Sequence, residues 1–294
     1  MAQALDIKKD IRAFWDSRPC DAERSTHPVG SREFFEDVRR WRYAYEHHIP
    51  AFADFPSAAG KAVLEIGLGV GVDHVEFARH GARMHGIDLS PQAVQITGRH
   101  LEVCGLRSEL QVADAEAIPY PADHFDVVYS YGVLLCIPNI AQAVAEIHRV
   151  LKPGGVARIM LYYKHSYNYW INIQVLRRLG LNLLRLPNGA QLASRLSGQP
   201  LEVMNKYKEI FAGARRPDGQ FFLNQNTDGP GNPYTSVYTK AECKRLFQEY
   251  RKLHQRAYFL NKSYIPLLGK LIPKPLENAT ARAIGWHLCI SAWK

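Results

Sequence analysis

Three closely spaced glycines follow a short apolar run and offer the first place in the chain where chemistry could occur. Residues 61–66 predict a buried strand, the turn reads Gly67-Leu-Gly69-Val-Gly71, and residues 72–80 have the apolar spacing of a helix. Glycine allows a tight turn and lets the backbone approach a ligand closely. Such a turn between a strand and a helix predicts a nucleotide site, and by itself it would suit a dinucleotide as well as another nucleoside-containing cofactor.

Two carboxylates follow the next two predicted strands. Asp88 ends the strand at 82–88, 17 positions after Gly71, where it can accept hydrogen bonds from both hydroxyls of a ribose. Asp114 follows the strand at 108–113, where an acidic side chain can accept from the exocyclic amine of adenine and the adjoining backbone can frame the ring. The ribose contact fits a nicotinamide dinucleotide too, whereas the segment 113–138 argues against that cofactor.

Strands and helices alternate through the first half of the chain. Ser90 as N-cap, Pro91 at the first helical position and Gly105 as the stop delimit one helix. The other elements are strands at 124–130 and 155–162 and a helix from Asn139 to Leu151. This alternation predicts an α/β fold, a Rossmann-like and mostly parallel sheet of seven strands with helices on both faces.

Four regions are expected along the chain. They are an N-terminal helical cap (1–59), a cofactor-binding core (60–162), a lid or substrate insertion after the fifth strand (163–239), and the C-terminal part of the core sheet (240–294). The insertion contains a helical stretch at 169–186 and a loop rich in Gly, Pro and Asn at 224–239. A helix near 240–249 and strands near 252–260 and 285–293 complete the sheet.

Four segments of the core resemble, in order and spacing, the motifs of class I methyltransferases that use S-adenosylmethionine (SAM). They are LEIGLGVG, GIDLSPQAV, VADAEAIPYPADHFDVVYSYGVL and IHRVLKPGG, within residues 61–162. The resemblance is nearest to the methyltransferase type 11, or quinone-biosynthesis C-methyltransferase-like, group, and the flank WRYAYEHHIPAFADF is similar to the lead-in of its bacterial small-molecule enzymes. It implies a SAM-dependent transferase that acts on a small molecule, releases S-adenosylhomocysteine (SAH) and needs no metal.

The resemblance also implies a set of cofactor-binding residues at the carboxyl ends of parallel strands. The set comprises the loop-ordering Glu65, then Gly67, Gly69 and Gly71 under the methionine and ribose, Asp88 and Leu89 at the ribose, Asp114 and Ala115 at the adenine, and Ser130 and Tyr131 beneath the methionine end.

The segment after the fourth strand departs from the pattern of many relatives. They read L-H-H-I/V-P there, whereas this chain has Cys136 and no histidine, so a general-base role cannot be carried over to this segment. Cys136 is expected to be a small buried apolar residue. An oxygen nucleophile would need a base, for which a histidine with a pKa of about 6.5 is suited. The catalytic candidates are Tyr163, His165, Tyr43, His47 and the neighbouring His48, and for each alone a packing or surface role stays open.

Composition and cysteine usage indicate an ordinary globular protein. The 294 residues are 47% hydrophobic and 22% charged. The five cysteines are odd in number and form no C-x-x-C pair, which favours a reducing compartment and no zinc site. The first residues lack the apolar core of a secretory signal, and no run of about 18 apolar residues occurs. We therefore expect a cytoplasmic, soluble protein.

The positive charge is confined to the C-terminal part. The net charge is −1 for residues 1–59, −3 for 60–160 and +13 for 161–294. A nucleic acid, a membrane surface, an anionic substrate or simply a solvated basic face would each fit this asymmetry. The apolar stretches 169–186 and 264–276 carry interspersed basic residues. They fit an amphiphilic or anionic acceptor, peripheral contact with an anionic membrane, or a lid helix whose arginines snorkel to solvent.

Three other functions remain as alternatives. A nucleic-acid methyltransferase would suit the basic part, but the chain has no Asn-Pro-Pro-Tyr or Asp-Pro-Pro-Tyr motif and no RNA-binding module. A SAM-binding protein without turnover would carry the same glycine turn. A nicotinamide dehydrogenase would bind NADH rather than SAM. The sequence leaves the acceptor, the methylated atom and the oligomeric state open.

Overall fold

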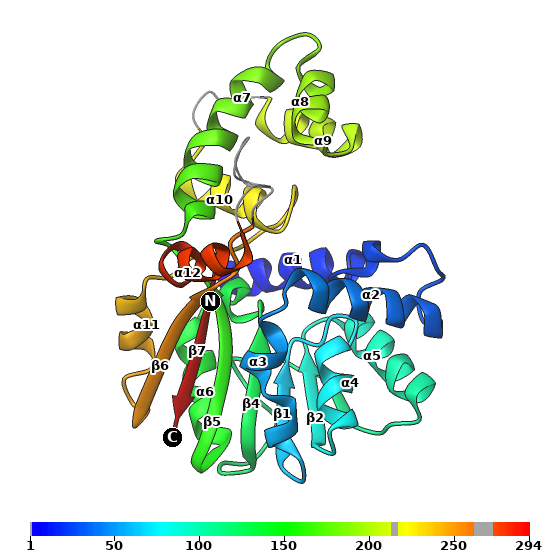
Figure 1. Cartoon of the computed structure of the whole chain (residues 1–294), viewed down its shortest axis with the longest axis vertical. Coiled ribbons are helices and arrows are strands. Elements are labelled where there is room, and N and C mark those ends of the chain that lie inside the picture. The colour runs from blue at the N-terminus through cyan, green and yellow to red at the C-terminus, as the bar shows by residue number, and fades with distance from the viewer. Residues whose placement is uncertain (1, 213–216, 262–272) are drawn as a thin grey trace.

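A seven-stranded sheet forms the centre of the computed structural model, which describes residues 2–212, 217–261 and 273–294 (Figure 1). Its strands are β1 (Ala62–Ile66), β2 (Arg83–Asp88), β3 (Glu109–Val112), β4 (Phe125–Tyr131), β5 (Leu151–Tyr162), β6 (Lys252–Tyr258) and β7 (His287–Trp293). The order is β3-β2-β1-β4-β5-β7-β6, and only β7 runs antiparallel to its neighbours. This confirms the predicted Rossmann-like α/β sheet.

Helices precede, connect and follow the strands. The α-helices are α1 (Ala2–Ser17), α2 (Arg32–Tyr45), α3 (Ile49–Ala53), α4 (Val72–Arg79), α5 (Pro91–Cys104), α6 (Ile140–Val150), α7 (Arg178–Leu184), α8 (Gly189–Ser197), α9 (Leu201–Phe211), α10 (Gly219–Thr227), α11 (Lys240–Leu246) and α12 (Lys274–Ile284). Short 3-10 turns lie at Ala22–Arg24, Phe55–Ala58 and Leu134–Cys136, and a π-helical segment, η4, spans Asn168–Arg177. Within the described ranges, no helix combines the length and apolarity that a membrane crossing needs.

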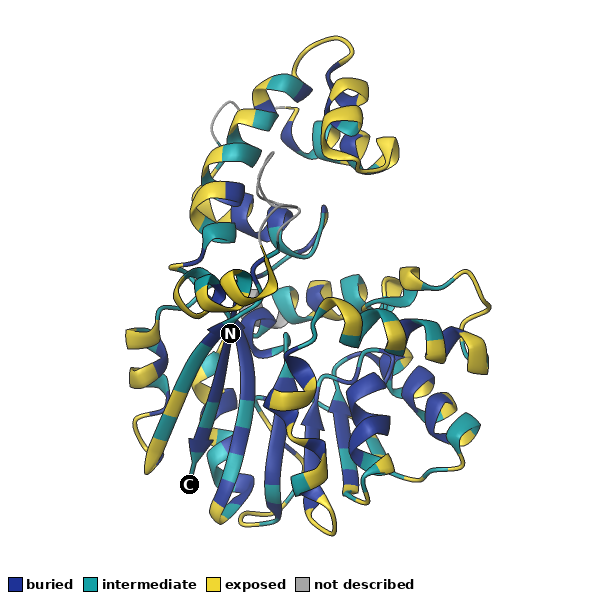
Figure 2. Ribbon diagram, viewed as in Figure 1, coloured by how far each residue is buried: buried dark blue, intermediate teal, exposed yellow. Residues whose placement is uncertain are grey.

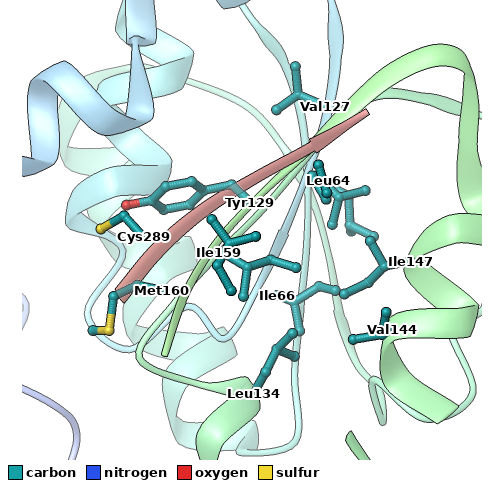
Figure 3. Packing of buried hydrophobic residues seen from close by; sticks show 14 of the residues in the cluster. Leu64, Ile66, Val127, Tyr129, Leu134, Val144, Ile147, Ile159, Met160 and Cys289 are labelled. Carbon is teal, nitrogen blue, oxygen red and sulfur yellow. The ribbon is translucent and has the colours of Figure 1, made fainter. Parts of the chain in front are cut away.

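Helices cover both faces of the sheet. Leu64 and Ile66 of β1 point to one face, where Ile147 of α6 packs beside them (Figure 3). The ring of Tyr129 on β4 points to the opposite face, and its centroid lies 5.2 Å from the ring centroid of Phe77 on α4. Because successive side chains of a strand alternate between faces, apolar residues at nearly every position of β1 and β4 require this double cover.

Four helices of the insertion stand away from the sheet. They are η4, α7, α8 and α9, here called the arm (residues 168–211), and they rise from the edge at which β1 to β5 end (Figure 1). Their buried side chains pack on one another and on Phe222 and Trp286. The arm therefore has a small core of its own.

The structure differs from the sequence prediction in three connecting segments. The loop predicted at 224–239 begins later, because α10 continues to Thr227. Asp218 caps α10 by accepting hydrogen bonds from two backbone N–H groups. Strand β5 begins at Leu151 rather than 155, with an irregular pairing to β4. Helix α12 was not predicted, and the apolar stretch at 264–276 lies largely outside the described residues.

The glycine turn is held in a conformation that only glycine adopts easily. Gly67 has φ +83°, and its N–H donates to the carbonyl oxygen of Ile87 at 2.8 Å, which ties the turn to β2. A Cβ atom at this position would overlap the side chain of Val133. Any side chain here therefore disturbs both the turn and the segment after β4.

Gly67→Ala should destabilise the protein more than Gly81→Ala. Gly81 has φ +82°, but no atom lies within 4 Å of the place that a Cβ atom would take, so this matched substitution introduces the backbone strain alone. We expect about 1–2 kcal/mol for the strain at either site and about 1–3 kcal/mol more at Gly67 for the overlap with Val133. Urea unfolding of both variants measures the difference, and equal losses would contradict the steric account.

Candidate functional site

A cavity of about 170 Å³ lies at the carboxyl ends of β1, β2, β3 and β4. The chain crosses from β3-β2-β1 to β4 here, and open α/β sheets bind ligands at such a reversal of strand order. Eight of the ten predicted cofactor residues line the cavity. They are Glu65, Gly67, Gly69, Asp88, Leu89, Asp114, Ala115 and Tyr131.

The other two predicted residues support the wall from behind. Gly71 is the N-cap of α4, and its N–H donates to the carbonyl oxygen of Leu68 at 2.8 Å. Ser130 is fully buried and its hydroxyl donates to the carbonyl oxygen of Ile66 at 3.0 Å. Both residues therefore fix the ends of the glycine turn without forming the cavity surface.

Asp88 joins the glycine turn to the end of β2. Its Oδ2 accepts from the N–H groups of Leu68 at 2.7 Å and Gly69 at 3.4 Å, and its Oδ1 accepts from Ser90 at 2.8 Å. Burial raises the pKa of the carboxyl, and these three N–H donors oppose the rise. A carboxylate offers about four acceptor positions, so Asp88 retains capacity for a hydroxyl group in the cavity.

Helix α1 lies across the cavity and forms ion pairs with the carboxylates that follow β3. The Lys8 ammonium lies 2.6 Å from Asp114 Oδ2 and 2.6 Å from Glu116 Oε2. Ile11, Arg12 and Trp15 also line the cavity. The sequence prediction missed these four residues, although their spacing of three and four places them on one face of a helix.

A buried ion pair supports the part of the cavity wall that α2 and α4 form. Arg42 of α2 donates to Asp73 of α4, with Nη2 and Oδ2 2.6 Å apart, and its Nη1 lies 3.4 Å from Asp21 Oδ2. Asp73 also accepts from the Tyr43 hydroxyl at 3.0 Å and the Tyr129 hydroxyl at 2.8 Å. The structure thus places Tyr43 in this network rather than on the cavity wall.

Tyr131 connects the cavity to a buried polar cluster. Its hydroxyl lies 2.9 Å from His48 Nε2 and 2.9 Å from His287 Nδ1. Burial lowers the pKa of His48 to about 3 and that of His287 well below its usual value, so both rings are neutral. Glu46 Oε1 lies 3.8 Å from His287 Nε2, and burial raises the pKa of Glu46 to about 7, although Arg42 opposes the rise. The cluster therefore contains two neutral histidines and one carboxyl group that titrates near neutral pH.

Carboxyl groups outnumber cationic side chains on the cavity wall. Six carboxyl groups line it, from Asp21, Glu65, Asp73, Asp88, Asp114 and Glu116, against the cations of Lys8, Arg12 and Arg42. Burial raises the pKa of Asp21, Glu65 and Asp88. Since a nearby cation would favour their ionised forms, the wall suits a positively charged ligand better than an anionic one.

The proposed catalytic candidates do not come together at the cavity. Tyr163 is buried at the end of β5 and pairs with Tyr238 through an isolated bridge, and His165 is exposed. His47 Nε2 lies 3.4 Å from Asn278 Oδ1. None of these three, nor Tyr43, is among the residues that line the cavity. Their roles stay predictions without support from this geometry.

A carboxylate that the sequence prediction missed lies behind the cavity wall. Tyr162 at the end of β5 donates its hydroxyl to Asp228 Oδ1 at 2.5 Å, and Thr235 donates to Asp228 Oδ2 at 3.1 Å. Thr235 is also within hydrogen-bonding reach of Cys136, which lines the cavity. Burial raises the pKa of Asp228. The predicted Gly/Pro/Asn loop contained this residue, but nothing in the sequence indicated which strand end it would reach.

Comparisons with known proteins agree with this fold. The family model described as a methyltransferase domain matches residues 64–159. A ubiquinone biosynthesis O-methyltransferase of Thiobacillus denitrificans is 38% identical over 182 residues, which cover 61% of this chain and 72% of that protein. A sterol 4-C-methyltransferase of Caenorhabditis elegans is 35% identical over 94 residues, which cover 31% of this chain and only 28% of that protein.

A solved structure shows the same fold. It is a methyltransferase from Haloferax volcanii in complex with the Trm112 methyltransferase activator, with a TM-score of 0.52, 18% identity and coverage of 96% of both chains. This match supports the fold alone, whereas the glycine turn, the strand order and the relative from Thiobacillus denitrificans define the class of protein. The chain belongs to the class I SAM-dependent methyltransferases.

Glu46→Gln should stabilise the protein more at pH 8 than at pH 5. A carboxyl with a pKa of about 7 when folded and 4.5 when unfolded binds its proton more tightly in the folded state. Its contribution to the free energy of unfolding therefore falls as pH rises from about 4.5 to about 7. We expect the two pH values to differ by about 1–3 kcal/mol in the effect of the substitution.

Thermal unfolding of the wild type and the variant at both pH values measures this effect. Glu36→Gln, on the exposed face of α2, serves as the control and should show no such difference. An equal effect of Glu46→Gln at pH 5 and pH 8 would show that Glu46 is ionised in the folded protein at both.

Proposed function

We propose that the cavity binds SAM and that the chain transfers its methyl group to a small-molecule acceptor. The observation that carries the proposal is the excess of carboxyl groups on a cavity that also contains the glycine turn. In this proposal Asp88 and Leu89 hold the ribose, Asp114 and Ala115 meet the adenine, and Tyr131 lies at the methionine end. The roles follow the resemblance to other members of the class.

The charge of the cavity supports SAM over a nicotinamide dinucleotide. SAM carries a sulfonium and an ammonium group against a single carboxylate, whereas a dinucleotide carries a pyrophosphate with two negative charges. Two unit charges 4 Å apart interact by about 4 kcal/mol at an effective dielectric constant of about 20. The wall has more carboxyl groups than cations, and each carboxyl group that is ionised favours the first ligand and repels the second.

SAM supplies an electrophilic methyl group, so the protein has to orient a nucleophile and exclude water. Helix α1 contributes Ile11 and Trp15 to the cavity and pairs Lys8 with Asp114, so it closes the cavity from above. Lys8 already forms an ion pair with Asp114, the carboxylate proposed for the adenine. We infer that the adenine shares Asp114 with the Lys8 ammonium or displaces that ammonium.

We infer that Asp228 is the proton acceptor, although it lies behind the wall that contains Cys136 and does not itself line the cavity. Its carboxyl lies behind Cys136, in the wall where many relatives carry a histidine, and Tyr162 and Thr235 orient it by donating hydrogen bonds. A carboxylate with a raised pKa is a stronger base than an exposed one. The relatives named above act in ubiquinone biosynthesis and on a sterol, which supports a largely apolar acceptor; they give the nucleic-acid alternative no support.

Calorimetric titration with SAM, SAH and NADH tests the cofactor proposal. We expect SAM and SAH to bind in the micromolar range and NADH not to bind. Asp88→Ala should weaken SAM binding at least tenfold, because it removes both the ribose contact and the support of the turn. Asp126→Ala is a matched control. Asp126 Oδ2 also accepts a hydrogen bond from a backbone N–H, that of Ala62 at 2.8 Å, but at the amino ends of β1 and β4, away from the cavity. Binding of NADH instead of SAM would sink the proposal.

Asp228→Asn should abolish most turnover while leaving SAM affinity within about twofold. General-base catalysis contributes about 10²–10⁴-fold, so the rate of SAH formation with an acceptor found by screening should fall at least 100-fold. Asp123→Asn, in an exposed loop, serves as the control for the same chemical change. A wild-type rate in Asp228→Asn would remove Asp228 from the mechanism, and a wild type that binds SAM but forms no methylated product would favour a binding protein without turnover.

A further inference from the structure

The arm presents an apolar surface that its own folding does not use. Its core already contains Ile173, Leu181, Leu184 and Met204, which are buried against one another and against Phe222. Additional large apolar residues of the arm are exposed, and Figure 2 shows exposed positions along its helices and turns. They are Trp170, Ile171, Val175, Leu179, Leu186, Leu192 and Leu196.

These side chains are concentrated in one part of the molecule. Among the residues that the structure describes, 13 large apolar side chains are exposed, and seven of them lie between residues 170 and 196. Leu179 is 61% exposed and Leu196 is 74% exposed. Ile171, Val175 and Leu179 follow one another at intervals of four, as do Leu192 and Leu196, so each helix carries a stripe rather than scattered residues. A concentration of exposed apolar side chains of this kind indicates an interaction site.

The charge of the same segment indicates the sign of the partner. Residues 168–200 contain four arginines, Arg177, Arg178, Arg185 and Arg195, and no aspartate or glutamate. Arg177 and Arg178 face inward, since Arg177 donates to the carbonyl oxygen of Asn226 at 2.9 Å and Arg178 lies 4.3 Å from the ring centroid of Phe222. Arg185 and Arg195 lie on the exposed side, beside Leu186 and Leu196.

We propose that the arm is a docking surface for an anionic lipid bilayer. Apolar side chains with neighbouring arginines match the boundary between acyl chains and negatively charged headgroups. Tryptophan, present here as Trp170, is a residue type that favours this boundary. A second copy of the chain would bring the same arginines together, and its charge would oppose the contact. The proposal concerns the arm alone and does not depend on the assignment of the cofactor.

Sedimentation of the full chain with vesicles tests the proposal. The probes are vesicles of phosphatidylcholine alone and vesicles in which about a third of the lipid is phosphatidylglycerol. We expect the wild type to bind the anionic vesicles at least tenfold more tightly, and to lose most of this binding at high salt, because exposed charges are then screened. Absence of binding, or equal binding to both kinds of vesicle, would overturn the proposal.

Two double variants separate the arm from general surface effects. Leu179→Glu with Leu196→Glu should reduce binding to the anionic vesicles at least tenfold. Val29→Glu with Val112→Glu makes the same change of charge at exposed apolar side chains outside the arm and should leave binding within about twofold. Circular dichroism confirms that both variants fold. A self-association of the wild type that the arm variant abolishes, without any effect on lipid binding, would assign the surface to a second copy instead.

Discussion

The buried carboxylate of Asp73 holds the N-terminal helices on the sheet. It accepts hydrogen bonds from Arg42 and Tyr43 of α2 and from Tyr129 of β4, and its side chain is only 2% exposed. Removal of one partner of such a pair leaves an uncompensated charge and costs about 3–5 kcal/mol. Because α2 is fixed in this way, the chain that precedes it can return over the strand ends, where α1 covers the cavity.

The two sides of the cavity come from different parts of the chain. The matched family region, residues 64–159, supplies the glycine turn, Asp88, Asp114 and Tyr131. Helix α1 covers the cavity, and the insertion supplies the carboxyl group of Asp228 behind Cys136. The region that matches the family model therefore supplies the part of the cavity wall at the strand ends, whereas α1 and Asp228 lie in segments that the family model does not match.

The sequence was sufficient for the sheet and for most of the cavity wall at the strand ends. Strands alternating with helices predict a parallel sheet, and residues at strand ends share one edge, so Gly67, Asp88 and Asp114 could be placed together without a structure. The catalytic candidates failed to meet at the cavity because side chains after β5 depend on where the insertion folds back. The sequence indicates Tyr163 as a candidate, whereas its neighbour Tyr162 reaches Asp228, because successive side chains point to opposite faces of the sheet. Lys8 was missed because α1 contacts residues more than one hundred positions away.

We propose that a carboxyl-rich cavity at the junction of β1 and β4 holds the adenosyl cofactor. A crystal structure of the chain grown with SAH tests it most directly. We expect the ribose hydroxyls at Asp88, the adenine between Ala115 and the Lys8–Asp114 pair, and the sulfur facing Tyr131 and the wall that contains Cys136. SAH bound elsewhere, or in this cavity with its adenine at Tyr131, would contradict the account.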